Sequence, residues 1–314
     1  MHRARRGENF PVASMLLPAH ARRSAHAFYA LARFGDDIAD CARLNDREKR
    51  ARLHALKSQV CGDGGETSDP ARMYAKELDR ALVRLNLAQG RVGAPIDVSY
   101  VRALLETLID AFLQDVRCDR YQTWDDLMQY CRLSAVPVGR FLVALTGGVK
   151  SGGVVGARDV SPELRATDAL SMALQILNHV QDLRADYRTL GRVYLPQCWI
   201  DAEGARREEL AETEMTRAMT RVKVRMLDGA DALLCMADGV GRNYVSARLK
   251  LEARGIHAIA RALSRRLRHA DPLARRVALS RLSTVKHFAL GIMRGAPDRN
   301  TPGQGLKQED FRRY

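Results

Sequence analysis

The sequence predicts an all-α protein whose helices form one bundle around a central cavity. Apolar residues recur every three or four positions along most of the 314 residues, and no stretch shows the alternation typical of a half-buried strand. The length permits one or two domains, but no linker rich in Pro, Gly or Ser divides the chain. We therefore expect a single domain over residues 1–294 and a disordered polar tail over 295–314.

The helices can be placed in order from periodicity and end signals. Asp46 is expected to cap the second helix, and Ser161 with Pro162 suits the start of a later one. Pro137 lies inside a long apolar segment and predicts a kink, because proline removes a helical hydrogen bond. An extended arm is expected before residue 16. The expected helices cover residues 19–40, 46–60, 71–87, 98–116, 124–145, 162–186, 206–237, 245–268 and 272–293.

The first expected helix carries an unusual polar stripe. Tyr29, Arg33, Asp36 and Asp40 are spaced at i, i+4, i+7 and i+11, which places them on one face. Asp37 lies about 100° to the side. Several carboxylates on one face of an apolar segment repel one another, and a bound cation offsets that repulsion.

A second stripe follows in the helix expected over residues 162–186. Asn178, Asp182 and Asp186 are spaced at i, i+4 and i+8, with Gln175 one turn earlier. Each stripe alone fits a solvated face with ion pairs, but two such stripes in apolar sequence favour a Mg2+ site that binds a phosphate or diphosphate. The expected metal ligands are Asp36, Asp37, Asp40, Asn178, Asp182 and Asp186.

Residues 187–196 follow the second stripe and contain two arginines and two tyrosines. This segment is either a loop that folds over a bound anion or an ordinary basic connector. The glycine-rich segment 147–156 lacks both the G-x-G-x-x-G spacing and a preceding strand, so we expect no nucleotide site there.

Charge and cysteine content narrow the class of protein. The formal charge of +14 and pI near 9.9 indicate a polyanionic partner, either nucleic acid, an anionic membrane or a diphosphate. Nucleic acid is disfavoured because the arginines are spread out without interleaved aromatic residues or a known module. Six cysteines without C-x-x-C spacing, no signal peptide and no apolar run of ~18 residues predict a cytoplasmic protein, with peripheral contact at the inner membrane face.

Four ordered motifs resemble the squalene and phytoene synthase family. Residues 29–40 match Y-x-x-x-R-x-x-D-D-x-x-D in full, and residues 175–186 match Q-x-x-N-x-x-x-D-x-x-x-D. Residues 191–196 match G-R-x-Y-L-P, and residues 130–139 contain the central Tyr-Cys and Val-Gly pairs. The resemblance implies an isoprenoid-synthase-type helical fold.

Within the family, residues 8–14 and Gln181 resemble the bacterial hydroxysqualene synthases of hopanoid biosynthesis. This resemblance implies Mg2+-dependent ionisation of presqualene diphosphate and capture by water. The alternatives are a presqualene diphosphate synthase or phytoene-type synthase and, more distantly, a non-catalytic assembly factor, which the complete set of carboxylates disfavours. Docking onto the enzyme that makes the substrate and use of NADPH are left open.

The resemblance also implies roles for individual residues. The expected catalytic residues are Asp36, Asp40, Asp182, Asp186 and Tyr130. The expected substrate-binding residues are Tyr29, Arg33, Phe34, Phe141, Gln175, Asn178, Arg188, Arg192 and Tyr194.

Overall fold

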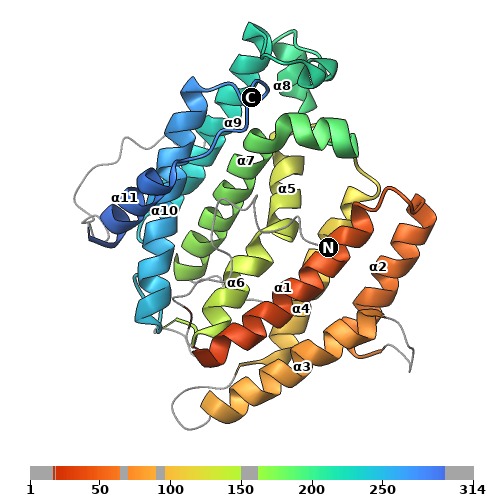
Figure 1. The fold of residues 1–314 in the computed structure, drawn as a ribbon, viewed down its shortest axis with the longest axis vertical. Coiled ribbons are helices and arrows are strands. Elements are labelled where there is room, and N and C mark those ends of the chain that lie inside the picture. Colours follow the sequence, from red (N-terminus) through yellow and green to blue (C-terminus); the bar gives the residue numbers. More distant parts are fainter. Residues whose placement is uncertain (1–16, 18, 64–69, 90–95, 150–161, 294–314) are drawn as a thin grey trace.

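The structure, a computed structural model, describes residues 17, 19–63, 70–89, 96–149 and 162–293 (Figure 1). Most of these residues are helical. The predicted all-α class is therefore confirmed. The helices are α1 Ala19–Ala39, α2 Asp46–Cys61, α3 Pro70–Gln89, α4 Val98–Asp115, α5 Trp124–Ser134, α6 Val136–Leu145, α7 Pro162–Leu190, α8 Gln197–Ala202, α9 Arg217–Met236, α10 Ala247–His269 and α11 Arg281–Met293, with a 3-10 helix, η1, at Arg207–Ala211. The expected arm, the cap at Ser161 and the polar tail lie outside the described residues.

Two short strands depart from the expectation of no strands. β1 (Arg120–Tyr121) and β2 (Val193–Pro196) pair in parallel, with Arg120 opposite Val193. The backbone N–H of Val193 donates to the carbonyl of Asp119 over 2.8 Å. β2 is buried at every position, so the sequence shows no alternation there. The strand pairing fixes part of the segment expected to be a loop.

Helix ends differ from the expected ones where side chains or proline decide them. Asn45, not Asp46, caps α2: its side chain accepts from the N–H of Glu48, whose carboxylate accepts from the N–H of Asn45. The segment expected to kink at Pro137 is instead two helices separated at Ala135. Pro137 then lies in the first turn of α6, where its missing N–H has no helical partner to lose.

Three later boundaries also shift. α7 continues past Asp186 to Leu190. The segment expected to be one helix over 206–237 is instead η1 followed by α9. Thr216 caps α9, because its side-chain hydroxyl accepts a hydrogen bond from the N–H of Met219. The helix expected over 272–293 begins only at Arg281, because two backbone carbonyls before it accept hydrogen bonds from side chains of α7.

α6 lies between the two helices that carry the acidic stripes and packs against both α1 and α7. Phe28 of α1 stacks on Phe141 of α6 with ring centroids 3.9 Å apart. On the other side, Arg140 forms two hydrogen bonds of 2.9 and 2.7 Å to Asp168 of α7. α1 and α7 are thus held on either side of one buried helix.

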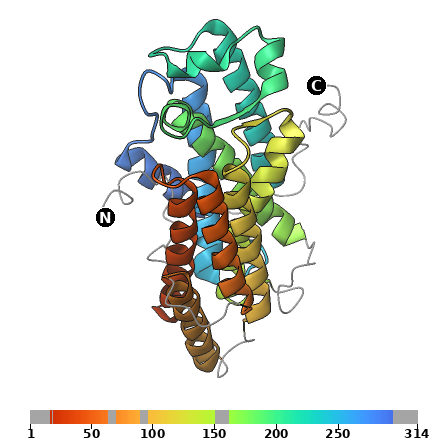
Figure 2. The same cartoon turned by 90° about the vertical axis from the view of Figure 1, so that its right-hand side faces the viewer.

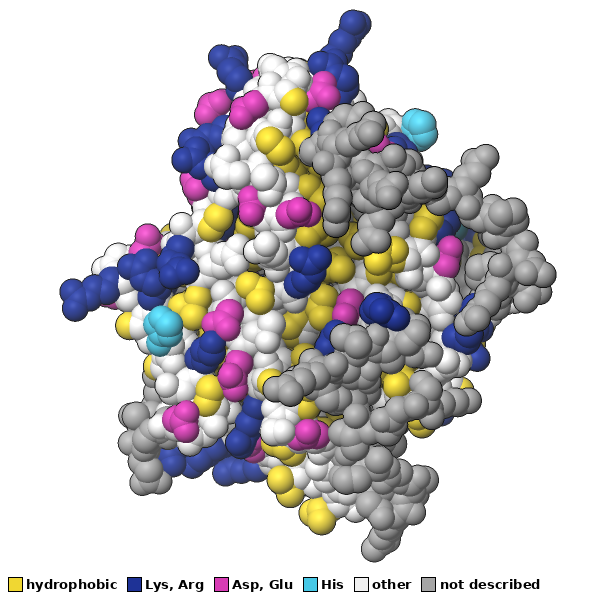
Figure 3. All heavy atoms as spheres, turned by 180° about the vertical axis from the view of Figure 1, so that it is seen from behind, with side chains coloured by type: hydrophobic (Ala, Val, Ile, Leu, Met, Phe, Trp, Pro, Cys, Tyr) yellow, Lys and Arg dark blue, Asp and Glu magenta, His cyan; other side chains and the backbone are white. Residues whose placement is uncertain are grey.

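The remaining helices complete the bundle around these three. Figure 2 shows α1, α2, α3 and α4 side by side, and these helices contact one another. On the far side, α9 and α10 pack against α7, and α11 packs on α10. No helix in the described part of the chain has an apolar stretch long enough for a membrane crossing. On the face in Figure 3, basic side chains are interspersed with acidic ones, so the positive charge is not gathered there in one patch.

Candidate active site

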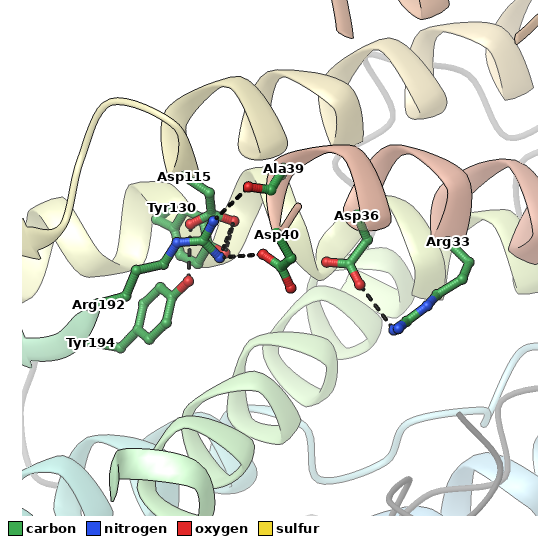
Figure 4. A network of polar contacts seen from close by, with 8 residues as sticks. All are labelled: Arg33, Asp36, Ala39, Asp40, Asp115, Tyr130, Arg192 and Tyr194. Carbon is green, nitrogen blue, oxygen red and sulfur yellow. Dashed lines mark hydrogen bonds and ion pairs between the residues drawn. The ribbon is translucent and has the colours of Figure 1, made fainter. Parts of the chain in front are cut away.

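The stripe on α1 is partly neutralised from within the same helix. Arg33 Nη1 lies 3.0 Å from Asp36 Oδ2 (Figure 4). Arg33 Nε lies 3.0 Å from Asp37 Oδ1. Burial, together with the nearby charge of Asp40, raises the pKa of Asp36 to about 7. The Asp37 side chain is 61% exposed and turns away from this buried face. Asp36 and Asp40 are therefore the carboxylates that α1 presents.

The stripe on α7 lies within electrostatic reach of the stripe on α1. Burial and the charges of Asp182, Asp40 and Asp115 together raise the pKa of Asp186 to about 8, although Arg192 opposes the rise. Among the described residues, Asp186 has no ion-pair partner. Arg276, from the segment between α10 and α11, places its Nε 3.3 Å from Asp182 Oδ1. The two stripes thus form one acidic cluster.

Arg192 connects the cluster to β2. Gly191, at φ 68°, ends α7 in the left-handed region and turns the chain into the strand. Arg192 Nη1 donates to Asp40 Oδ1 over 2.8 Å, and Nη2 donates to the carbonyl of Ala39 over 3.4 Å. The same guanidinium lies 4.0 Å from Asp115 Oδ2. A buried arginine therefore joins α1, α4 and β2.

Asp115, the last residue of α4, was not predicted as a site residue. Its two carboxylate oxygens accept hydrogen bonds from the hydroxyls of Tyr130, over 2.8 Å, and Tyr194, over 3.0 Å (Figure 4). Burial raises its pKa to about 6, although Arg192 and the two hydroxyls oppose that rise. An acid at the C-terminal end of an apolar helix is unfavourable because it lies at the negative end of the helix dipole. This position is the feature of the sequence that could have identified Asp115 as a site residue.

His179 belongs to the packing beneath this network. Its ring stacks on Tyr194 at 3.9 Å, and burial lowers its pKa to about 3, so the imidazole is neutral. The rings of Tyr121 and Tyr130 both stack on Tyr194, with centroids 5.9 and 5.4 Å away. Burial also raises the pKa of Tyr130 well above its ordinary value, so its hydroxyl keeps its proton. Neutral rings therefore surround the Asp115 carboxylate.

The squalene/phytoene synthase family model matches residues 3–283. The chain belongs to this family. Hydroxysqualene synthases from Sinorhizobium fredii and Rhodopseudomonas palustris are 34% and 35% identical to it, covering 98% and 96% of this chain and 94% and 92% of theirs. A crystal structure of squalene synthase HpnC from Alicyclobacillus acidocaldarius aligns with a TM-score of 0.62 at 26% identity, over 82% of this chain and 86% of that one. The protein is thus an isoprenoid synthase of a family that processes prenyl diphosphates.

Membership in this family gives the other predicted residues a context. Gln175 and Asn178 lie half-buried on α7, the helix that carries Asp182. Arg188 is exposed and donates to the carbonyl of Ala211 over 2.7 Å, away from the ion pairs of the cluster. The substrate-binding roles of all three remain predictions.

The predicted aromatic residues differ in burial. Phe34 is half-buried and stacks on Tyr74 of α3 at 4.8 Å. Tyr29 packs edge-on against Phe28 at 5.9 Å. Phe141 is fully buried in its stack on Phe28, so in this structure it joins α1 to α6. Phe34 is therefore the more accessible candidate for a hydrocarbon chain.

The carboxylates fit a metal that needs further ligands from its substrate. Among the described residues, no three His, Cys, Asp or Glu side chains lie so that they alone could hold a metal ion. Mg2+ commonly takes only one or two carboxylates, with phosphate and water oxygens completing its shell. The carboxylate oxygens of Asp36 and Asp186, whose pKa values are raised by burial and by neighbouring acids, suit such a cation. Arginines pair with three of the carboxylates in this structure: Arg33 with Asp36, Arg192 with Asp40 and Arg276 with Asp182.

Proposed function

We propose that the chain is a hydroxysqualene synthase, which ionises presqualene diphosphate and lets water capture the cation, giving hydroxysqualene and diphosphate. The observation that carries the proposal is the single cluster formed by Asp36, Asp40 and Asp186 with buried Arg192. Two relatives named hydroxysqualene synthase align over nearly the whole chain, which favours this reaction over others in the family.

The acidic residues would hold the metal, and the arginines would hold the leaving group. Asp36, Asp40, Asp182 and Asp186 are the residues that would bind Mg2+, which when bound neutralises charge on the diphosphate. Guanidinium N–H groups match carboxylate and phosphate oxygens alike. Arg192, now on Asp40, can therefore donate to a diphosphate oxygen as negative charge grows there.

Asp115 would orient the Arg192 guanidinium for that hydrogen bond. It fixes Arg192 from one side and the hydroxyls of Tyr130 and Tyr194 from the other. A buried arginine with prearranged partners needs little reorganisation when charge develops beside it. The neutral aromatic residues next to it exclude water and can stabilise a nearby carbocation through their ring faces.

A product assay tests the reaction. Purified protein with Mg2+ and detergent is given presqualene diphosphate or farnesyl diphosphate, each with and without NADPH. Hydroxysqualene from presqualene diphosphate alone, without NADPH, is the expected result. Squalene formed only with NADPH, or a condensation product from farnesyl diphosphate, would assign a different reaction to the same site.

We also propose that the enzyme works at an anionic membrane surface. α11 has no buried residue, and it exposes Leu282 (81%), Val285 (66%) and Met293 (70%) beside basic Arg281 and Lys286. An apolar face with basic neighbours and no acidic residue suits anionic lipid headgroups.

Vesicle sedimentation tests the membrane proposal. The protein is expected to bind vesicles containing phosphatidylglycerol, and the L282Q/V285Q variant is expected to lose that binding. M73Q/L87Q on α3 is the control, because it removes equally exposed apolar side chains from another helix. Equal loss in both variants would count against α11.

A further inference from the structure

The segment between α10 and α11, residues 271–280, crosses α7 beside the second acidic stripe; we name it the strap. Its Leu273 and Val277 side chains are buried, yet the segment is not helical. The backbone carbonyls of these two residues therefore need donors from elsewhere. α7 supplies them: Arg184 Nη1 donates to the Leu273 carbonyl over 3.0 Å, and Gln181 Nε2 donates to the Val277 carbonyl.

Consecutive residues of α7 thus contact consecutive residues of the strap. Gln181, which is only 2% exposed, holds the backbone of Val277. Asp182, the next residue on α7, faces the Arg276 guanidinium, which precedes Val277 on the strap. Because a buried hydrogen bond fixes the backbone one residue away, it restricts where the long Arg276 side chain can reach.

We propose that Gln181 is a positioning residue that, with Arg184, clasps the strap to α7 and keeps Arg276 at the diphosphate site. This inference rests on the proposed function, since it makes Arg276, which lies beside Asp182, a further phosphate-binding arginine. Gln181 does not touch the substrate in this role. It acts through the backbone of Val277.

Binding of inorganic pyrophosphate with Mg2+, measured by calorimetry, tests the clasp without the prenyl chain. R276Q is expected to weaken binding about tenfold, the effect of losing one hydrogen bond to a charged group. Q181L removes the donor at similar size and is expected to weaken binding by a comparable factor. The double variant is expected to be no weaker than R276Q alone, because both changes remove the same interaction. Additive losses, or unchanged binding in Q181L, would overturn the proposal.

A matched control separates positioning from general loss of stability. Asn86 also donates its side-chain amide to a backbone carbonyl, that of Ile96, over 3.0 Å, between α3 and α4. N86L is expected to lower the melting temperature but to leave pyrophosphate affinity unchanged. If Q181L does not fold, R184M removes the other half of the clasp and is expected to show the same non-additivity with R276Q.

Hydrogen exchange keeps the inference distinct from the proposed function. Amides of residues 273–280 are expected to exchange faster in Q181L than in the wild type or N86L. If the wild type binds no pyrophosphate, the proposed diphosphate site is wrong. The exchange rates alone then test whether Gln181 holds the strap on α7. Unchanged exchange in Q181L would then overturn the clasp.

Discussion

The acidic stripes on α1 and α7 have similar spacing in the sequence, but their charges are compensated from different places. On α1, Arg33 compensates Asp36 and Asp37 from one turn away, and Arg192, the residue before β2, reaches Asp40. On α7, Arg276 reaches Asp182 from the strap, and among described residues Asp186 has no ion-pair partner. The α1 stripe is therefore partly compensated within its own helix, whereas the α7 stripe depends on residues from other elements, and at Asp186 the nearby charge of Arg192 only partly opposes the rise in pKa.

The largest effect is expected when a carboxylate is removed from the stripe on α7. D182N is expected to lower turnover by at least about a thousandfold, because it weakens charge stabilisation where the diphosphate leaves. Helicity and melting temperature are expected to change little, since the ion pair with Arg276 is half exposed. Steady-state kinetics and circular dichroism check both parts.

D79N is the matched control for that variant. Asp79 pairs with Arg102 at 3.0 Å, with side-chain exposures of 41% and 35% that mirror those of Asp182 and Arg276. D79N is expected to keep full activity. Normal activity in D182N, or equal loss in D79N, would remove Asp182 from the site.

The effect of intermediate size distinguishes Arg192, which follows the end of α7, from Arg33, which lies on α1 itself. R192A is expected to lower kcat about a hundredfold as well as raising KM, because charge grows beside Arg192 in the transition state. R33A is expected to cost only a few-fold, since its side chain is 58% exposed against 9% for Arg192. A loss in R192A confined to KM would limit that residue to binding.

The smallest expected effect concerns stability without metal. Because the folded-state pKa of Asp186 is raised to about 8, the folded protein keeps a proton that the unfolded chain loses above pH ~4. Its contribution to stability therefore falls as pH rises from ~4 to about 8 and is lowest above that. D186N is expected to raise the melting temperature by about 1–3 °C at pH 9 and not at pH 4.

D40N gives the contrast on α1, because it removes the partner of buried Arg192 and is expected to lower the melting temperature. Calorimetric scans with a chelator present compare the two variants. A higher melting temperature in both at pH 9 would show that the two stripes are equally uncompensated.

Sequence reasoning recovered the features that depend on residues close in the chain. The helical class and both acidic stripes follow from spacing within one or two helices. It missed Asp115 and Arg276, whose partners come from other elements. The Arg276 contact to Asp182 spans 94 positions, and no local pattern marks either residue as its partner.

The same limit explains the misplaced boundaries. β1 and β2 are too short to show a period, and each exists only through pairing with the other. The strap reads as helical by composition, but bonds from Gln181 and Arg184 to its carbonyls favour another conformation. Tertiary hydrogen bonds overrode local propensity at these places.

The contact between Arg192 and Asp40 also has a consequence for protein synthesis. Its two residues are 152 positions apart, so at about 5–20 residues per second the ribosome adds Arg192 roughly 8–30 s after Asp40. During that interval the first acidic helix has left or is leaving the ribosome without its buried counter-ion. The candidate active site therefore cannot be complete until more than three fifths of the chain has been translated.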